Sequence, residues 1–84
     1  LYKQGQVRWY HKPKKGMTYV LGLDPSLGTG GDYSAIQVFE LPGMKQCAEW
    51  QHNKTTIQEQ ITILKQITKY IFGITNDNNN IYYI

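Results

Sequence analysis

The chain has 84 residues, of which 40% are hydrophobic, and its formal net charge is +3. This length allows one small domain, which buries about 60% of its unfolded surface. A single cysteine excludes an internal disulfide, no Cys/His cluster offers a zinc site, and no hydrophobic run reaches the ~20 residues that span a membrane. We therefore expect a soluble intracellular protein without a membrane partner.

Residues 1–16 form a basic leader. It contains no acidic residue and five cations, Lys3, Arg8, Lys12, Lys14 and Lys15. Aromatic residues lie among these cations, and such a segment suits contacts with nucleic acid phosphates that do not read the base sequence. The alternative that the sequence leaves open is a solvated, partly disordered leader. A short strand is expected at 7–10.

The first strand of the domain is predicted at 18–24. Residues 18–23 form an apolar run that ends at Asp24. Pro25 directs Asp24 toward extended backbone and prevents continuation as a helix. Residues 26–33 are rich in residues that tolerate a positive φ, which predicts a loop.

Two further strands are predicted after this loop. Residues 34–41 alternate in polarity and place Ile36 and Val38 on one face. A turn at 42–44 leads to a strand with weaker alternation at 45–52. Three adjacent strands with short connections predict an antiparallel meander.

The side chains of these strands are assigned to core or solvent by residue type. Phe39 and Trp50 are expected in the core, and Cys47 is expected as a small apolar residue in a strand. Glu40 and Glu49 are expected to face solvent, because a carboxylate is rarely buried without a partner.

A helix is predicted after the meander. Apolar residues recur at the helical spacings of four and three, at Ile57, Ile61, Leu64, Ile67 and Ile71. Thr56 and Glu59 predict a capping box at its start, and Gly73 is the predicted C-cap. A polar turn at 75–80 then leads to a last strand at 81–84.

The predicted order is therefore β-β-β-α-β, in which the helix carries the chain back so that the last strand lies parallel to the first. Residues 1–16 are the leader or linker, and residues 17–84 form an α/β unit. The C-terminal ends of the first and last strands would meet at one sheet edge, where ligands collect in such sheets. Because 81–84 resembles an unfinished strand, we expect the chain to be a fragment.

Asp24 is the first candidate metal ligand at that edge, and Asp32 on the returning loop is the second. A site for two divalent cations about 4 Å apart needs several carboxylates, so two acids are too few and others are expected after residue 84. The alternative is that both are turn residues, since Asp-Pro and Gly-Asp are common in turns. The nearby glycines do not form a phosphate-binding loop, because no G-K-[ST] follows them.

The stretch YVLGLDPSLGTGGDYSAIQVFE resembles the start of the nuclease domain of the large terminase subunit of tailed phages. The resemblance covers roughly residues 5–84. Its most specific part is a G-x-D-x-x-x-G…D-[YF]-S pattern at Gly22, Asp24, Gly28, Asp32, Tyr33 and Ser34. It implies that residues 17–84 are the N-terminal part of a ribonuclease H-like nuclease domain, a β-β-β-α-β half domain.

The resemblance also implies chemistry. Asp24 would be the first catalytic, metal-binding carboxylate and Asp32 an auxiliary metal ligand. DNA contacts would come from the leader, at Arg8, Lys12, Lys14 and Lys15. The intact parent would use two Mg²⁺ or Mn²⁺ ions to cut concatemers of a viral genome during packaging, in the cytoplasm of a bacterial host. The 84 residues alone lack the remaining carboxylates and are expected to be inactive.

The partners implied are double-stranded DNA and, for the intact parent, an ATPase motor domain, the small terminase subunit and the portal. Three alternatives remain open. Another ribonuclease H-like enzyme, such as a junction resolvase, also begins with a strand that ends in Asp, but usually without GDYS. In an actin-like or sugar-kinase ATPase fragment, Asp24 and its hairpin would face the phosphates of ATP. A non-catalytic DNA-binding module would use the leader as its DNA arm.

Overall fold

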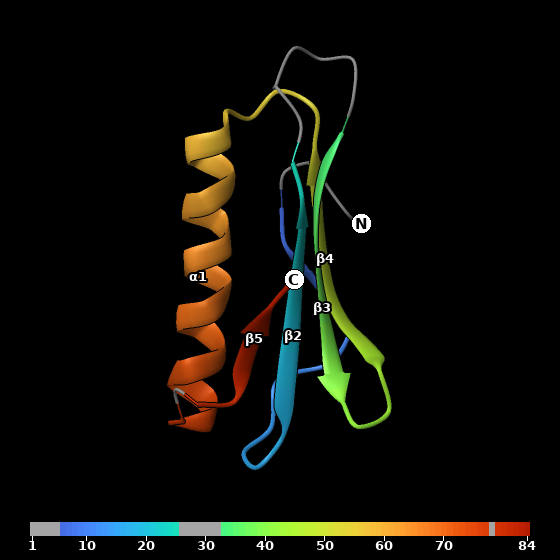
Figure 1. Cartoon of the computed structure of the whole chain (residues 1–84), viewed down its shortest axis with the longest axis vertical. Coiled ribbons are helices and arrows are strands. Elements are labelled where there is room, and N and C mark those ends of the chain that lie inside the picture. Colours follow the sequence, from blue (N-terminus) through green and yellow to red (C-terminus); the bar gives the residue numbers. More distant parts are fainter. Residues whose placement is uncertain (1–5, 26–32, 78) are drawn as a thin grey trace.

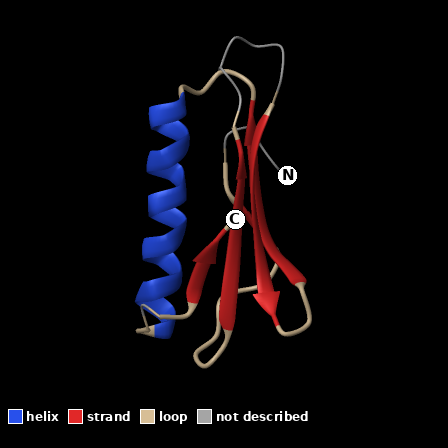
Figure 2. Ribbon diagram, viewed as in Figure 1, coloured by secondary structure: helices blue, strands red, loops and turns tan. Residues whose placement is uncertain are grey.

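In the computed structural model, a mixed β-sheet carries a helix along one face (Figures 1 and 2). The structure describes residues 6–25, 33–77 and 79–84, and within them the sheet has five strands and the helix is single. The elements are β1 (Arg8–Trp9), β2 (Thr18–Asp24), β3 (Ser34–Leu41), β4 (Lys45–His52), α1 (Ile57–Thr75) and β5 (Ile81–Tyr83).

The strand order is β1-β4-β3-β2-β5. The antiparallel meander is confirmed, since β3 pairs antiparallel with both β2 and β4. The parallel last strand is also confirmed, since β5 pairs with β2 in the same direction. The short strand expected in the leader is β1, which pairs antiparallel with β4. The α/β class predicted from the sequence is therefore observed.

The helix covers the face of the sheet that carries Ile36 and Val38, and both side chains are fully buried. Their neighbours in the core come from three strands and the helix, namely Tyr19, Leu21, Cys47, Ala48, Trp50, Ile67 and Ile71. We call the opposite side the open face, because no described helix packs on it. Phe39 points to this open face and is half-buried, so its assignment to the core was wrong.

Capping residues define both ends of α1. The Glu59 N–H donates to Thr56 Oγ1 over 3.1 Å and the Thr56 N–H donates to Glu59 Oε1 over 2.9 Å, which confirms the predicted capping box. These hydrogen bonds lower the pKa of Glu59. The predicted C-cap was wrong, because the helix continues through Gly73. It ends where Asn76 adopts the left-handed conformation, which Asn tolerates, with φ 54° and ψ 37°.

The helix face that packs on the sheet differs from the predicted stripe. Ile67 and Ile71 are buried as expected, but Ile57 and Ile61 are 43% and 42% exposed. Gln60 is fully buried instead, and its Nε2 donates to the Thr55 carbonyl over 3.0 Å. The buried side of the helix therefore includes Gln60, Ile67 and Ile71 and differs from the predicted apolar side. Ile61 lies beside β5, at the edge of the sheet.

A buried polar cluster joins the leader to the sheet. The Tyr19 hydroxyl accepts a hydrogen bond from the Lys14 N–H over 2.7 Å and donates to Glu40 Oε2 over 3.0 Å. Glu40 is only 7% exposed, so its predicted solvent-facing position was wrong. The register explains this position, because Tyr19 lies directly opposite Glu40 and the two side chains share one face. Burial, with the nearby Glu40, raises the pKa of Tyr19 to about 12.

No helix within the described residues has both the length and the apolar character needed to cross a membrane.

Replacing Tyr19 with Phe is expected to lower the free energy of unfolding at neutral pH by about 1–3 kcal/mol, because the Glu40 carboxylate and the Lys14 amide each lose a buried partner. Urea denaturation measures this loss. Tyr82→Phe is the control, since Tyr82 is 57% exposed and should tolerate the change.

The same comparison has a predicted pH dependence. A tyrosine in the unfolded chain ionises near 10.0, whereas Tyr19 in the folded chain ionises at about 12. The folded state keeps a proton that the unfolded state has lost, so this stabilisation is complete below pH 10 and disappears as the pH rises through 12. The difference between wild type and Tyr19→Phe should therefore shrink above pH 10. A constant difference would show that Tyr19 does not titrate in this way.

Candidate functional site

Asp24 is the last residue of β2 and is exposed. Leu21 and Leu23 point to the helix-covered face, and Asp24, as the next residue of the strand, points to the open face. The backbone of Asp24 is paired with Ala35 of β3, so the strand end that carries the carboxylate is held in the sheet. No hydrogen bond or ion pair joins this carboxylate to another described residue, which leaves its oxygens available to a ligand from solvent.

A shallow hollow of about 370 Å³ lies on the open face beside Asp24. Its small residues are Gly22 and Ala35, while Phe39 and Ile84 contribute apolar surface. A methyl group on Gly22 would lie 3.6 Å from the Ile84 side chain, which is an ordinary van der Waals contact, so an alanine would fit at this position. The hollow is mostly apolar and bordered by a carboxylate.

The parallel pairing of β2 with β5 sets the environment of Asp24. Tyr19 lies opposite Ile81, and the register continues with Leu21 opposite Tyr83. The Ile84 N–H donates to the Leu21 carbonyl over 2.9 Å, so the pairing extends past β5. Both strands run toward the same edge of the sheet (Figure 1). The parallel direction is as expected, but β5 ends at Tyr83 opposite Leu21, so within the described residues Asp24 lies three positions beyond the end of the pairing.

Two residues of the sequence pattern, Tyr33 and Ser34, differ in their exposure to solvent. Ser34 is fully buried, and its hydroxyl donates to the His52 carbonyl over 3.0 Å. This bond ties the start of β3 to the end of β4 and fixes one end of the loop that follows Asp24. Tyr33 is 51% exposed at the same end of the sheet.

Asp32, the second predicted metal ligand, lies outside the described residues, as does Gly28.

Three of the predicted DNA-binding residues lie far from Asp24. Lys12, Lys14 and Lys15 are exposed in the connection between β1 and β2, at the strand end opposite Asp24. A seven-residue strand at about 3.3 Å per residue separates the two ends by about 20 Å. The structure therefore does not bring these lysines to the carboxylate.

Arg8, the fourth predicted DNA-binding residue, lies on the open face. It is opposite Glu49 of β4, which is opposite Gln37 of β3, and Gln37 is opposite Gly22. The guanidinium lies over the Tyr10 ring, 5.1 Å from its centroid. Arg8 therefore shares a face with Asp24 but is separated from it by two strands.

Gln37 is a site residue that sequence reasoning did not identify as a candidate. It is exposed and lines the hollow together with Asp24, and these two residues supply its oxygen-bearing side chains. Strand alternation was the available signal, since it places Gln37 on the face opposite Ile36 and Val38. It could not show which neighbouring strand end would lie beside Gln37.

Mg²⁺ and Mn²⁺ prefer oxygen ligands, and one carboxylate with one amide is part of such a set. Among the described residues, no three His, Cys, Asp or Glu side chains come together as a metal site. Asp24 and Gln37 therefore fit a contribution to a metal site rather than a complete one. Cys47 offers no nucleophile, because its thiol is in the core and burial raises its pKa.

No protein-family model matches the chain, and no curated protein matches it either.

Asp24→Asn is expected to change the free energy of unfolding by less than about 0.5 kcal/mol, because the exposed carboxylate has no described partner to lose. Ser34→Ala is the contrasting variant and should cost about 1 kcal/mol through its lost hydrogen bond. Urea denaturation compares the two. A loss above about 1 kcal/mol for Asp24→Asn would identify Asp24 as a structural turn residue.

Proposed function

We propose that this chain is the N-terminal half of a ribonuclease H-like nuclease domain of the large terminase type. In this proposal the intact parent is a metal-dependent endonuclease that cuts double-stranded DNA, and Asp24 is one of its metal ligands. The observation that carries the proposal is the exposed position of Asp24 at the C-terminal end of β2, a strand that also pairs with the parallel strand β5. The resemblance of the GDYS motif to that nuclease family adds to it.

The β-β-β-α-β order is consistent with this proposal but is not specific to it. One arrangement that can hold carboxylates at the end of a sheet has three parts. A strand ends in an acid, a meander pairs with it on one side, and a parallel strand pairs with it on the other. In this chain β2 is paired with β3 up to Asp24 itself, so Asp24 is attached to a strand end that is held in the sheet. A rigid strand end suits a metal ligand, because ligand positions must be held closely.

The register indicates where a second acid would be effective in the parent. Val20 pairs with Tyr82 and Leu21 pairs with Tyr83, so a continued parallel register would place the second residue after Ile84 opposite Asp24. We propose that the parent carries a carboxylate at or next to that position. Two carboxylates on neighbouring strands could then share a cation.

Bound Mg²⁺ or Mn²⁺ would supply an activated water to attack the phosphorus and would stabilise charge on the attacking and leaving oxygens. The residues of this chain would bind and position the cation and the DNA. Asp24 would hold its carboxylate at the open face, and Gln37 would offer an uncharged oxygen or an N–H group beside it. The small residues of the hollow would allow a DNA backbone to approach the strand end.

The leader would bind DNA independently of the cleavage site. Lys12, Lys14 and Lys15 precede the start of β2, and that strand is about 20 Å long, which is about the length of six base pairs. A duplex lying along β2 would therefore reach both ends of the strand. Such lysines contact phosphates and position the duplex without reading its sequence.

Asp24→Asn in the intact parent is expected to reduce cleavage in Mg²⁺ or Mn²⁺ at least about a thousandfold, because the metal site loses a charged ligand. DNA affinity should stay within about twofold, since the leader is unchanged. The matched control is Glu49→Gln, which removes an acid from the same face but outside the hollow. Substantial cleavage by Asp24→Asn would refute the assignment of Asp24.

Replacing Lys12, Lys14 and Lys15 with Gln should weaken binding to duplex DNA and reduce the slope of log K against log salt by up to about 3. Fluorescence anisotropy over a series of salt concentrations measures both effects. The control replaces the same number of exposed lysines elsewhere, at Lys54, Lys65 and Lys69. Equal losses from both triple variants would show that binding depends on total charge and not on the leader.

A further inference from the structure

Lys45 lies close to the basic leader in the fold, although it is distant from the leader in the sequence. It is the first residue of β4 and is exposed. The strand register places it directly opposite Glu40, the carboxylate of the buried polar cluster. Since Glu40 is in turn opposite Tyr19, the three residues form one row across β4, β3 and β2.

The leader joins this row at Lys14. The Lys14 N–H donates to the Tyr19 hydroxyl over 2.7 Å, and the same hydroxyl donates to Glu40 Oε2 over 3.0 Å. Lys14 and Lys45 are therefore both neighbours of the Tyr19–Glu40 pair. Because β2 and β4 are two strand spacings apart, the separation between the two lysines is on the order of 10 Å.

Cys47 provides a second link between the leader and the start of β4. Its carbonyl accepts hydrogen bonds from the Tyr10 and His11 N–H groups over 2.7 and 3.2 Å. Burial, with the Glu40 charge, raises the pKa of the Cys47 thiol, whereas the positive charges of Lys45 and Lys14 act in the opposite direction. The two ammonium groups therefore lie near the same buried side chain.

Further contacts hold the leader against the ends of the strands. Pro13 is buried, and the Met17 carbonyl accepts a hydrogen bond from Asn80 Nδ2 over 3.0 Å. Figure 1 shows this part of the leader and the turn between β3 and β4 at the same end of the sheet. The fold therefore sets where the leader lysines lie relative to Lys45. We call Lys12, Lys14, Lys15 and Lys45 the lysine cluster.

The acids at this end of the sheet are engaged elsewhere. The Glu40 carboxylate is buried and accepts the hydrogen bond from Tyr19. Asp77 lies in the connection between α1 and β5, and its carboxylate accepts the Asn79 N–H over 2.9 Å. Two strands, β3 and β2, separate β5 from β4. Among the described residues, no ion pair neutralises Lys45.

The charge of the lysine cluster indicates a polyanionic partner. Lysine side chains are rarely buried without a paired acid, so another polypeptide segment would cover this cluster only if it supplied carboxylates. Duplex DNA carries a phosphate at about every 3.4 Å along each strand, so lysines about 10 Å apart span about three base pairs. Four lysines at this spacing can therefore contact phosphates of one duplex.

We propose that Lys45 and the three leader lysines form one surface that binds the phosphate backbone of duplex DNA. The inference rests on the proposed function, in which duplex DNA is the partner, and it adds Lys45 to the contact surface. A lysine binds phosphate as a point charge, so the surface would not read the base sequence. The leader and β4 would thus act together, although they are far apart in the chain.

The test measures binding of a 20-base-pair duplex to the 84-residue chain and to the intact parent, by fluorescence anisotropy over a series of salt concentrations. Lys45→Gln should reduce the slope of log K against log salt by about 1 and weaken binding about threefold to tenfold near 0.1 M salt. Lys45→Arg keeps the charge and should restore both values. A loss in the 84-residue chain but not in the parent would overturn the proposal, because another segment would then cover Lys45.

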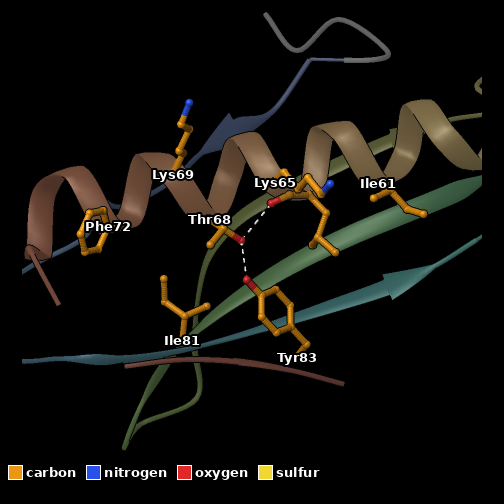
Figure 3. Close-up of a pocket in the computed structure, with 8 residues that line it drawn as sticks. Ile61, Lys65, Thr68, Lys69, Phe72, Ile81 and Tyr83 are labelled. Carbon is orange, nitrogen blue, oxygen red and sulfur yellow. Dashed lines mark hydrogen bonds between the residues drawn. The ribbon is translucent and has the colours of Figure 1, made fainter. Parts of the chain in front are cut away.

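Lys69→Gln is the matched control, since it removes the same charge from another exposed lysine. Figure 3 shows Lys69 on α1 near Ile81 of β5, whereas Lys45 is on β4. Lys69→Gln should leave the slope within about 0.3 of the wild-type value. Equal effects of Lys45→Gln and Lys69→Gln would overturn the proposal in favour of a dependence on total charge.

The triple replacement of Lys12, Lys14 and Lys15 with Gln separates this inference from the proposed function. A loss of binding with the triple variant but none with Lys45→Gln would overturn only the assignment of Lys45. No loss with either variant would refute the DNA-binding role of the leader, and the lysine cluster with it.

Discussion

The packing of α1 on one face of the sheet is the interaction on which the rest of the structure depends. A parallel strand cannot follow its partner through a tight turn, because the chain must first return to the other end of the sheet. The 19 residues of α1 provide this return, since they span about 28 Å and the longest strands span about 25 Å. Burial of Ile67 and Ile71 against the sheet therefore delivers the chain to the position where β5 can pair with β2.

This arrangement places β2 between the antiparallel meander and the parallel strand β5. It pairs with β3 on one side and β5 on the other, and it carries the hydroxyl of Tyr19 into the buried cluster with Glu40. That cluster satisfies a carboxylate that would otherwise be costly to bury, and it also binds the leader through Lys14. One end of β2 thus anchors the basic leader, while the other end presents Asp24.

The two faces of the sheet offer different chemistry. The open face has a carboxylate beside a mostly apolar hollow. The helix-covered face has an apolar hollow between α1 and β5. Since β5 borders both, it contributes Ile84 to one surface and Ile81 to the other through the alternation of its side chains.

The sequence by itself determined the elements, because their signals are local. Alternation along β3 placed Ile36 and Val38 together on one face, which the structure shows to be the covered face, and the Thr56–Glu59 pair marked the start of α1. These signals act between residues a few positions apart, so they remain visible without a fold. The helix end was misplaced because Gly73 and Asn76 can both end a helix, and packing decided between them.

Only the tertiary structure decided which distant residues meet. The burial of Glu40 depends on a partner that lies 21 positions earlier in the chain, and no local pattern encodes that distance. The exposure of Ile61 depends on where the edge of the sheet falls beneath the helix. The sequence identified Asp24 as a strand end, but which residues of β2 pair with β5 depends on how α1 packs on the sheet and returns the chain. Contacts between distant segments are set by the burial of whole faces, and that is a property of the folded chain.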